Sequence, residues 1–184
     1  FGYWGPELFS RIHQMDPVAV KSAFALNFGV SGLVGMLAFG VVSDRLSKRG
    51  MEWPVRLAAV AITAATLAIL AAVWAPSFAG SMVLAIPAGV LGGGWSVGLI
   101  ATLQYVLPVR YRASATALFY ALSTLGGYLI APWITGLLSQ ILGDDGHSLR
   151  LALTIVIPFG FLGALLTALA SLGVERGRQQ LAIA

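Results

Sequence analysis

The residues of this chain that could carry out chemistry are few, and their spacing does not fit catalysis. Residues 29–32 read Gly-Val-Ser-Gly and match the G-x-S-G pattern of intramembrane serine proteases. That chemistry needs a histidine within hydrogen-bond reach of the serine. The only two histidines, His13 and His147, fall in predicted loops. The pattern therefore indicates that Ser31 is a small packing or cavity residue and not a nucleophile.

Nucleotide and metal sites are not indicated either. The run Gly92-Gly93-Gly94 is not followed by the Lys-Ser/Thr pair of a phosphate-binding loop. The chain has no cysteine, no H-E-x-x-H sequence and no pair of aspartates inside an apolar segment. We therefore expect no cofactor, no metal and no enzymatic activity.

The composition indicates a membrane protein. Of the 184 residues, 58% are hydrophobic and only 10% are charged, and the mean hydropathy is +0.88. Soluble domains carry about 25% charged residues, so this chain has too few charges to cover a surface that faces water. We predict an all-α polytopic integral membrane protein. Its net charge of +4 does not indicate nucleic acid, because the charges lie between apolar runs.

Helices long enough to cross the bilayer must position the remaining polar residues. A helix needs about 20 apolar residues to span ~30 Å of hydrocarbon. The stretch from Leu57 to Val109 has no charge and is broken at Pro76, which ends helices. The longer fifth segment is expected to tilt or kink at Gly126-Gly127 and Pro132. The predicted spans are residues 1–9 (partial), 22–42, 57–74, 78–106, 113–141 and 151–174. Residues 10–21, 43–56, 108–112 and 143–150 are predicted loops, and residues 175–184 a polar tail.

The basic residues predict the orientation. Lys and Arg are enriched in loops on the cytoplasmic side of membrane proteins. One alternate set of loops carries eight of them, and the other carries Arg11, Lys21 and Arg150. We therefore predict a cytoplasmic C-terminus, in a bacterial inner membrane. The eight are Arg45, Lys48, Arg49, Arg56, Arg110, Arg112, Arg176 and Arg178.

Glycines recur at helical spacings in two of the predicted spans. Small residues let helix backbones approach closely in lipid, which predicts tight packing. Pro87 falls close to Gly92, Gly93 and Gly94 in mid-span, so this helix is expected to bend and to take part in gating. The alternative is that these glycines serve packing alone. The glycines are Gly29, Gly32, Gly35 and Gly40 in one span, and Gly89, Gly93, Gly94 and Gly98 in the other.

Charged residues are most concentrated at residues 40–50, and the spacing of this segment resembles a known motif. The sequence Gly40-x-x-x-Asp44-Arg45-x-x-Lys48-Arg49 resembles G-x-x-x-D-[RK]-x-G-[RK]-[RK], the signature loop of the major facilitator superfamily, with Ser47 in place of the second glycine. In that superfamily the loop joins helices two and three, and also eight and nine. The resemblance implies the C-terminal six-helix half of a twelve-helix transporter. The chain would contain the end of helix seven and helices eight to twelve. Because it begins with Phe1, we expect it to start inside a larger protein, whose N-terminal half is its partner.

Three further motifs are similar to those of the Spinster-like family within this superfamily. They are Trp4-x-Pro6, the run from Gln104 through Pro108 and Arg112 to Ala117, and Ser148-Leu-Arg150. Ser123 stands where that family often has Asn. The resemblance implies a secondary transporter that moves amphiphilic lipids, such as lysophospholipids or sphingoid phosphates, coupled to protons. Organic-anion symporters also carry the W-x-P motif, so a symporter or exporter of small organic anions or drugs is the alternative. A non-transporting membrane subunit or receptor fragment is the alternative of a different class.

A substrate cavity in this chain would be polar, uncharged and aromatic. Ionisable residues inside membranes usually mark proton or ion paths, and the complete predicted spans contain none. Glu7 is the one candidate for a titrating carboxylate here, and the alternative is an interfacial carboxylate near Arg11. A proton-binding carboxylate would otherwise lie in the N-terminal half. Each lining residue could instead serve helix packing. The candidates are Tyr3, Trp4, Glu7, Asn27, Ser31, Trp95, Tyr120, Ser123, Thr124 and Tyr128.

The charged loop is also predicted to form a conformational latch. Asp44 should end its helix, where the negative end of the helix dipole disfavours a carboxylate. It therefore needs a positive partner, which is Arg45 or Arg49 locally, or a helix of the N-terminal half. Arg110 and Arg112 should face the equivalent loop of that half. The alternative is a loop that only sets topology. The predicted latch residues are Gly40, Asp44, Arg45, Arg49, Arg110 and Arg112.

Overall fold

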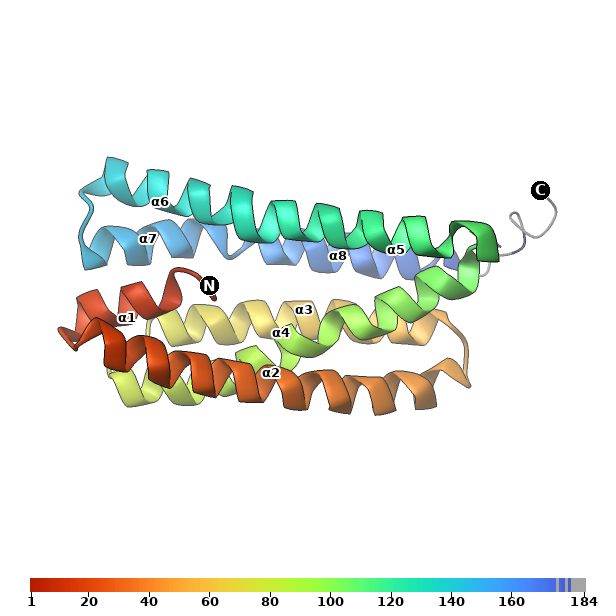
Figure 1. Ribbon diagram of the computed structural model, residues 1–184, viewed down its shortest axis with the longest axis horizontal. Coiled ribbons are helices and arrows are strands. Elements are labelled where there is room, and N and C mark those ends of the chain that lie inside the picture. Colours follow the sequence, from red (N-terminus) through yellow and green to blue (C-terminus); the bar gives the residue numbers. More distant parts are fainter. Residues whose placement is uncertain (175, 178, 180–184) are drawn as a thin grey trace.

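The computed structural model describes residues 1–174, 176–177 and 179, and the described residues are helical, without strands. In Figure 1, α2, α3 and α4 run along one side of the molecule and α5 to α8 along the other, with α1 beside them at one end. Five helical segments of the described chain are long and apolar enough to cross a membrane. The predicted all-α polytopic membrane fold is therefore confirmed.

The helices follow one another with short connections. The segment from α5 to α6 is one continuous helix whose middle is π-helical, and α7 and α8 together form the last long segment. The bounds are α1 Gly5–His13, α2 Pro17–Ser47, α3 Glu52–Val73, α4 Phe78–Val106, α5 Val109–Thr124, the π-helix η1 Leu125–Ile130, α6 Ala131–Leu142, α7 Gly146–Val156 and α8 Phe159–Ser171.

The predicted loop at residues 10–21 is wrong, because most of it is helical. Helix α1 continues to His13, and α2 begins at Pro17 and not at residue 22. Asp16 caps α2, since its side chain accepts a hydrogen bond from the Ala19 amide at 2.9 Å and Pro17 occupies the first helical position. The helices therefore continue through turns that carry charged side chains, beyond the apolar runs from which their bounds were predicted.

Two more predicted boundaries change for similar local reasons. Helix α2 continues to Ser47 and α3 already begins at Glu52, where a carboxylate in the first turn is favourable to the helix dipole. The predicted span 151–174 begins earlier, at Gly146, and is interrupted between Val156 and Phe159, where Pro158 lacks a backbone N–H. Helix α4 has the predicted bounds. Of the predicted tail, residues 175, 178 and 180–184 lie outside the described residues.

Helices α2 and α4 pack with their backbones in contact. A Cβ atom on Gly35 would lie 2.7 Å from the carbonyl carbon of Val90, and one on Gly93 would lie 2.7 Å from the Cα atom of Gly32. Only residues without a side chain permit this approach, as expected for helices that associate in lipid. Gly40 has nothing within 4 Å of its Cβ position, so packing within this chain does not require a glycine there.

The buried core gathers where α1 meets the ends of α2, α3 and α7. Phe9 and Leu8 are its largest fully buried side chains, and Phe24 stacks on Phe28 with ring centroids 5.2 Å apart. By contrast, α5 and η1 contain no buried residue. The long helix of α5, η1 and α6 therefore presents most of its surface to lipid or to a partner. The core cluster consists of Leu8, Phe9, Val20, Phe24, Ala72, Val73, Leu149 and Leu153.

Candidate functional site

A cavity of about 500 Å³ lies between the start of α1, α3, the segment of η1 and α6, and the segment of α7 and α8. We call it the central cavity. It brings together three of the predicted cavity residues, Tyr3, Trp4 and Tyr128. Its wall includes the π-helical turn η1 and the interruption between α7 and α8, where irregular backbone inside a membrane protein usually lines a cavity. The lining residues are Phe1, Gly2, Tyr3, Trp4, Phe28, Thr66, Ile69, Gly127, Tyr128, Ala131, Pro132, Thr135, Leu153, Val156, Ile157, Phe159 and Gly160.

The Trp4 indole and two of the hydroxyls that line the central cavity form hydrogen bonds within the protein. The indole N–H of Trp4 donates to the Pro132 carbonyl at 2.8 Å. The hydroxyls of Thr66 and Thr135 each donate at 2.8 Å to a carbonyl of their own helix, Ile62 and Ala131. No charged side chain lines the cavity. It can therefore accommodate an apolar or aromatic group, and it offers nothing to neutralise a charge.

Sequence reasoning missed Phe28, Thr66 and Thr135 as lining residues. The signal for the two threonines was a hydroxyl inside an apolar segment, at a position where it bonds back to the carbonyl four residues earlier. Such threonines also occur outside the central cavity. Thr167, for example, donates to Gly163 in the same manner and lines a different groove, between α3, α4 and α8, so the signal does not single out the central cavity.

The other predicted cavity residues do not line the central cavity. Tyr120 and Thr124 line a shallow groove on the surface of α5 and η1, which Tyr128 also borders. Trp95 lies against the ring of Phe119, with centroids 6.1 Å apart. Ser123 is half-buried on α5.

Asn27 and Ser31 serve the packing of α2 on α4. The Asn27 side chain donates to the Met82 carbonyl at 2.9 Å. The Ser31 hydroxyl donates to the Phe28 carbonyl at 3.1 Å and lies where a Cβ of Gly89 would be. Both also border an apolar surface groove between the two helices. This placement agrees with the packing interpretation of Ser31.

Glu7 lies outside the central cavity. Its carboxylate accepts a hydrogen bond from the Arg11 guanidinium at 2.9 Å, and Arg11 also reaches the Asp144 carboxylate at 3.3 Å. This ion-pair chain joins α1 to the turn between α6 and α7. In this arrangement the Glu7 carboxylate contributes to contacts between helices at the end of the bundle.

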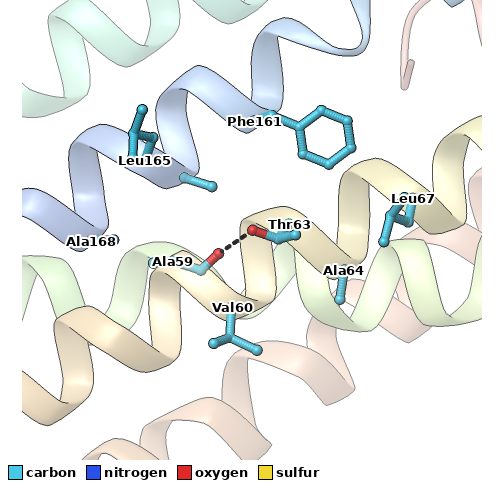
Figure 2. A pocket seen from close by; sticks show the side chains of 9 residues that line it. Ala59, Val60, Thr63, Ala64, Leu67, Phe161, Leu165 and Ala168 are labelled. Atoms are coloured by element: carbon cyan, nitrogen blue, oxygen red, sulfur yellow. Dashed lines mark hydrogen bonds between the residues drawn. The ribbon is translucent and has the colours of Figure 1, made fainter.

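A further groove, of about 470 Å³, runs between α3 and α8. Figure 2 shows the side chains of Val60 and Leu67 on α3, and of Phe161 and Leu165 on α8, around it. Its one hydroxyl, on Thr63, donates to the Ala59 carbonyl at 2.9 Å. The groove is therefore an apolar surface without free polar groups.

Five of the six predicted latch residues lie at one end of the bundle, which we call the basic end, whereas Gly40 lies further inside α2. The basic end carries the turn from α2 to α3 and the turn from α4 to α5, on the right of Figure 1. Asp44 is in the last turn of α2, and Arg110 and Arg112 are in the first turn of α5. Among the described residues, Asp44 makes no ion pair with Arg45, Arg49 or any other cation. Arg110 stacks over Tyr111 at 4.7 Å, and Arg112 donates to the Leu107 carbonyl at 3.1 Å.

The proline and glycines of α4 lie in one continuous helix. Pro87 is exposed inside it. Gly93 and Gly94 face α2, where a Cβ of Gly94 would lie 2.7 Å from the Phe39 Cβ atom, while Gly92 has nothing within 4 Å. Two of the three glycines predicted to bend the helix therefore have packing roles.

Comparison with known proteins gives two findings. The sequence model of the Major Facilitator Superfamily matches residues 1–181. An MFS-type efflux pump of Mycolicibacterium smegmatis is 28% identical over 178 residues, which cover 94% of this chain and 41% of the relative. The chain thus spans less than half the length of this curated relative.

Proposed function

Because the chain belongs to the Major Facilitator Superfamily, and so to transporters rather than enzymes, we propose that it forms the C-terminal six-helix half of a secondary transporter. In this proposal α1 is the end of helix seven, and the five long helical segments are helices eight to twelve of the Spinster-like resemblance. The partner is an N-terminal half of six helices. The two halves rock about a site near the middle of the membrane.

The observation that carries the proposal is the set of charges at the basic end. Asp44 lies at the C-terminal end of α2, and Arg110 and Arg112 lie at the N-terminal end of α5. Each charge has the sign that its helix dipole disfavours. Asp44 also has no ion-pair partner among the described residues. Partners on a second rigid body would remove both penalties, and an N-terminal half supplies such a body.

The geometry of α1 supports the same division of the protein. This helix has 9 residues, whereas the membrane-crossing segments have 22 to 34. Phe1 and Gly2, which precede α1, line the central cavity. In this proposal the N-terminal half covers the open side of this cavity, so that the central cavity of the complete transporter is bounded by both halves.

We propose that the basic end and the C-terminus lie on the cytoplasmic side of a bacterial inner membrane. Eight of the eleven Lys and Arg residues belong to the turns at the basic end and to the C-terminal tail, and such residues are enriched on the cytoplasmic side. Contacts from Asp44, Arg110 and Arg112 to the N-terminal half would then close the cytoplasmic side in the outward-facing state.

For the substrate we propose an amphiphilic lipid of the lysophospholipid or sphingoid phosphate type, coupled to protons. The uncharged aromatic wall formed by Trp4, Phe28 and Tyr128 suits an apolar tail, and the head group and the proton would be bound by the other half. Export of a drug is the second candidate, and the similarity to a protein named as an efflux pump favours it. Apolar drugs would suit the same wall.

Reconstitution of the full-length protein in liposomes tests the proposal. Labelled lysophospholipid, a lipophilic cationic dye and a small organic anion are each offered with and without a pH gradient. Movement of the lipid that depends on the gradient supports the first candidate. Movement of the dye alone supports drug export, and movement of the anion alone supports a symporter. If none of the three moves although the protein is correctly inserted, the transporter assignment fails and a non-transporting subunit is favoured.

A further inference from the structure

A second cluster of polar groups lies at the end of the bundle opposite the basic end, and the proposed function does not use it. It contains His13 at the end of α1, Trp74 at the end of α3, Phe78 at the start of α4 and Arg150 on α7. The ring of His13 lies 6.1 Å from that of Phe78, edge to face. The guanidinium of Arg150 lies 5.3 Å from the ring centre of Trp74. We call these four residues the histidine cluster.

The polar atoms of the cluster are incompletely paired. The Nε2 atom of His13 and the Nε atom of Arg150 are both buried, and neither has a hydrogen-bond partner among the residues that the structure describes. The neighbouring Trp74 indole N–H is already donated to Thr154 at 3.0 Å. A neutral imidazole tolerates this environment because it can leave one ring nitrogen unprotonated. An imidazolium would have to bury a second N–H and a positive charge there.

The charges around His13 do not favour its protonation. Arg150 is permanently cationic and raises the cost of a second positive charge at His13. Glu7 and Asp144, the nearest carboxylates in the chain of ion pairs, are both held by Arg11. The carboxyl end of α1 acts in the opposite sense, but a helix of 9 residues has a small dipole. The titratable and charged groups on the elements that pack against His13 are Glu7 and Arg11 on α1, Asp16 and Lys21 at the start of α2, Asp144 and Asp145 in the turn before α7, and His147 and Arg150 on α7.

We propose that His13 is a pH-sensitive contact that holds α1 against α4 and α7 while its imidazole is neutral, and that loosens α1 when the imidazole is protonated. The docked state is the one in which the ring packs between Phe9 and Phe78, at 6.4 and 6.1 Å. Because α1 also carries the Trp4 wall of the central cavity, its release would open that wall from the end opposite the basic end.

The direction of the pH dependence follows from the burial. Desolvation first, and the charge of Arg150 second, lower the pKa of His13 from its ordinary value of 6.5. The docked state therefore binds fewer protons than the released state. Docking is complete above about pH 6.5 and weakens progressively as the pH falls below that value.

Hydrogen exchange of the full-length protein in detergent tests this proposal. Exchange of the α1 amides is measured at pH 7.5 and pH 5.5 and corrected for the intrinsic effect of pH on exchange. We expect at least threefold faster corrected exchange of α1 at the lower pH, with α2 and α3 unchanged. His13→Gln should remove this difference. The matched control is His147→Gln, which changes the exposed histidine of α7 and should retain the difference.

A direct titration keeps the proposal testable if a His13 variant fails to fold. The protein is labelled with 13C-histidine, and the His13 resonance is assigned by the change in its chemical shift in Phe78→Leu, which removes the aromatic ring 6.1 Å from that of His13. We expect His13 to titrate below pH 6.5 in the wild type and closer to that value in Arg150→Gln. A His13 titration at or above 6.5, or a pH difference in exchange that survives His13→Gln, overturns the proposal. Neither result bears on transport, which is measured separately.

Discussion

Gly35 of α2 and Val90 of α4 are in direct backbone contact, and a Cβ atom on Gly35 would overlap the Val90 carbonyl group. We predict that Gly35→Ala forces the two helices apart and lowers the free energy of unfolding by about 1–3 kcal/mol, as overpacking of a tight interior does. Thermal unfolding in detergent measures the change. Gly29→Ala is the matched control on the same helix, because nothing lies within 4 Å of its Cβ position. Equal losses for both variants would show that the loss of a helical glycine, and not the contact, is responsible.

The hydrogen bond from the Trp4 indole to the Pro132 carbonyl joins α1 to α6. Trp4→Phe keeps an aromatic ring but removes the donor, so we expect a loss of about 1 kcal/mol in unfolding free energy. Thermal unfolding followed by circular dichroism measures it. Trp133→Phe is the control, because Trp133 neighbours the acceptor on α6 and is 66% exposed. A similar loss in the control would contradict the assignment to this bond.

Asp145 caps α7, and its carboxylate accepts hydrogen bonds from the hydroxyl and the amide of Ser148 at 2.6 and 2.7 Å. These bonds lower the pKa of Asp145 from its ordinary value of 3.8. The folded state therefore binds fewer protons, and the stabilisation is complete above about pH 4 and lost as the pH falls through the lowered pKa. We expect Asp145→Asn, which can still cap, to show a smaller fall in melting temperature between pH 6 and pH 3 than the wild type. An unchanged fall would assign the acid sensitivity to other groups.

Asp44 tests the proposed latch. If Asp44 bonds to the N-terminal half in the outward-facing state, Asp44→Asn removes a charge-assisted interaction of about 1–3 kcal/mol. The ratio of inward- to outward-facing molecules should then rise by roughly 5- to 150-fold. Distances between spin labels placed across the basic end measure the populations in the full-length protein. Glu52→Gln is the control, because Glu52 lies at the same end in the first turn of α3. Unchanged distances in Asp44→Asn would favour a loop that only sets topology.

Substitution of Glu7 tests whether this chain supplies the carboxylate that binds the coupled proton. Its carboxylate is held by Arg11 at 2.9 Å and does not line the central cavity. We therefore expect Glu7→Gln to leave accumulation driven by a pH gradient within about twofold of the wild type in liposomes, because its ion pair is partly exposed and contributes little. Accumulation that no longer responds to the gradient would instead identify Glu7 as the titrating group.

The sequence predicts the spans well because lipid imposes a length on apolar segments, and it places the ends of the helices less well. The turns that hold Arg11 and Lys21 read as loops because they are charged. They are helical because Asp16 and Pro17 start α2. Charge marks where a helix leaves the hydrocarbon, whereas capping groups mark where it ends, and the two positions differ by several residues.

The candidate site is less predictable, since residue type does not fix the direction in which a side chain points. Trp4 and Tyr128 line the central cavity, while Ser31, chosen for the same polar and neutral character, packs against Gly89. A soluble helix reveals its inner face by apolar periodicity, but a membrane helix is apolar on both faces. The face of α2 that meets α4 is marked by its small residues, and the lining of the cavity has no comparable mark.

The π-helical turn at Leu125–Ile130 also determines how far the residues of α6 are rotated about the helix axis relative to those of α5. A π-helix bonds each amide to the carbonyl five residues earlier, one more than in an α-helix, so η1 holds one surplus residue. Each residue of an α-helix advances by about 100° around the axis. Without the surplus residue, α6 would be rotated by about that angle relative to α5, and the Pro132 carbonyl would no longer face the Trp4 indole. The junction of α1 with α6 therefore depends on a single extra residue of helical winding.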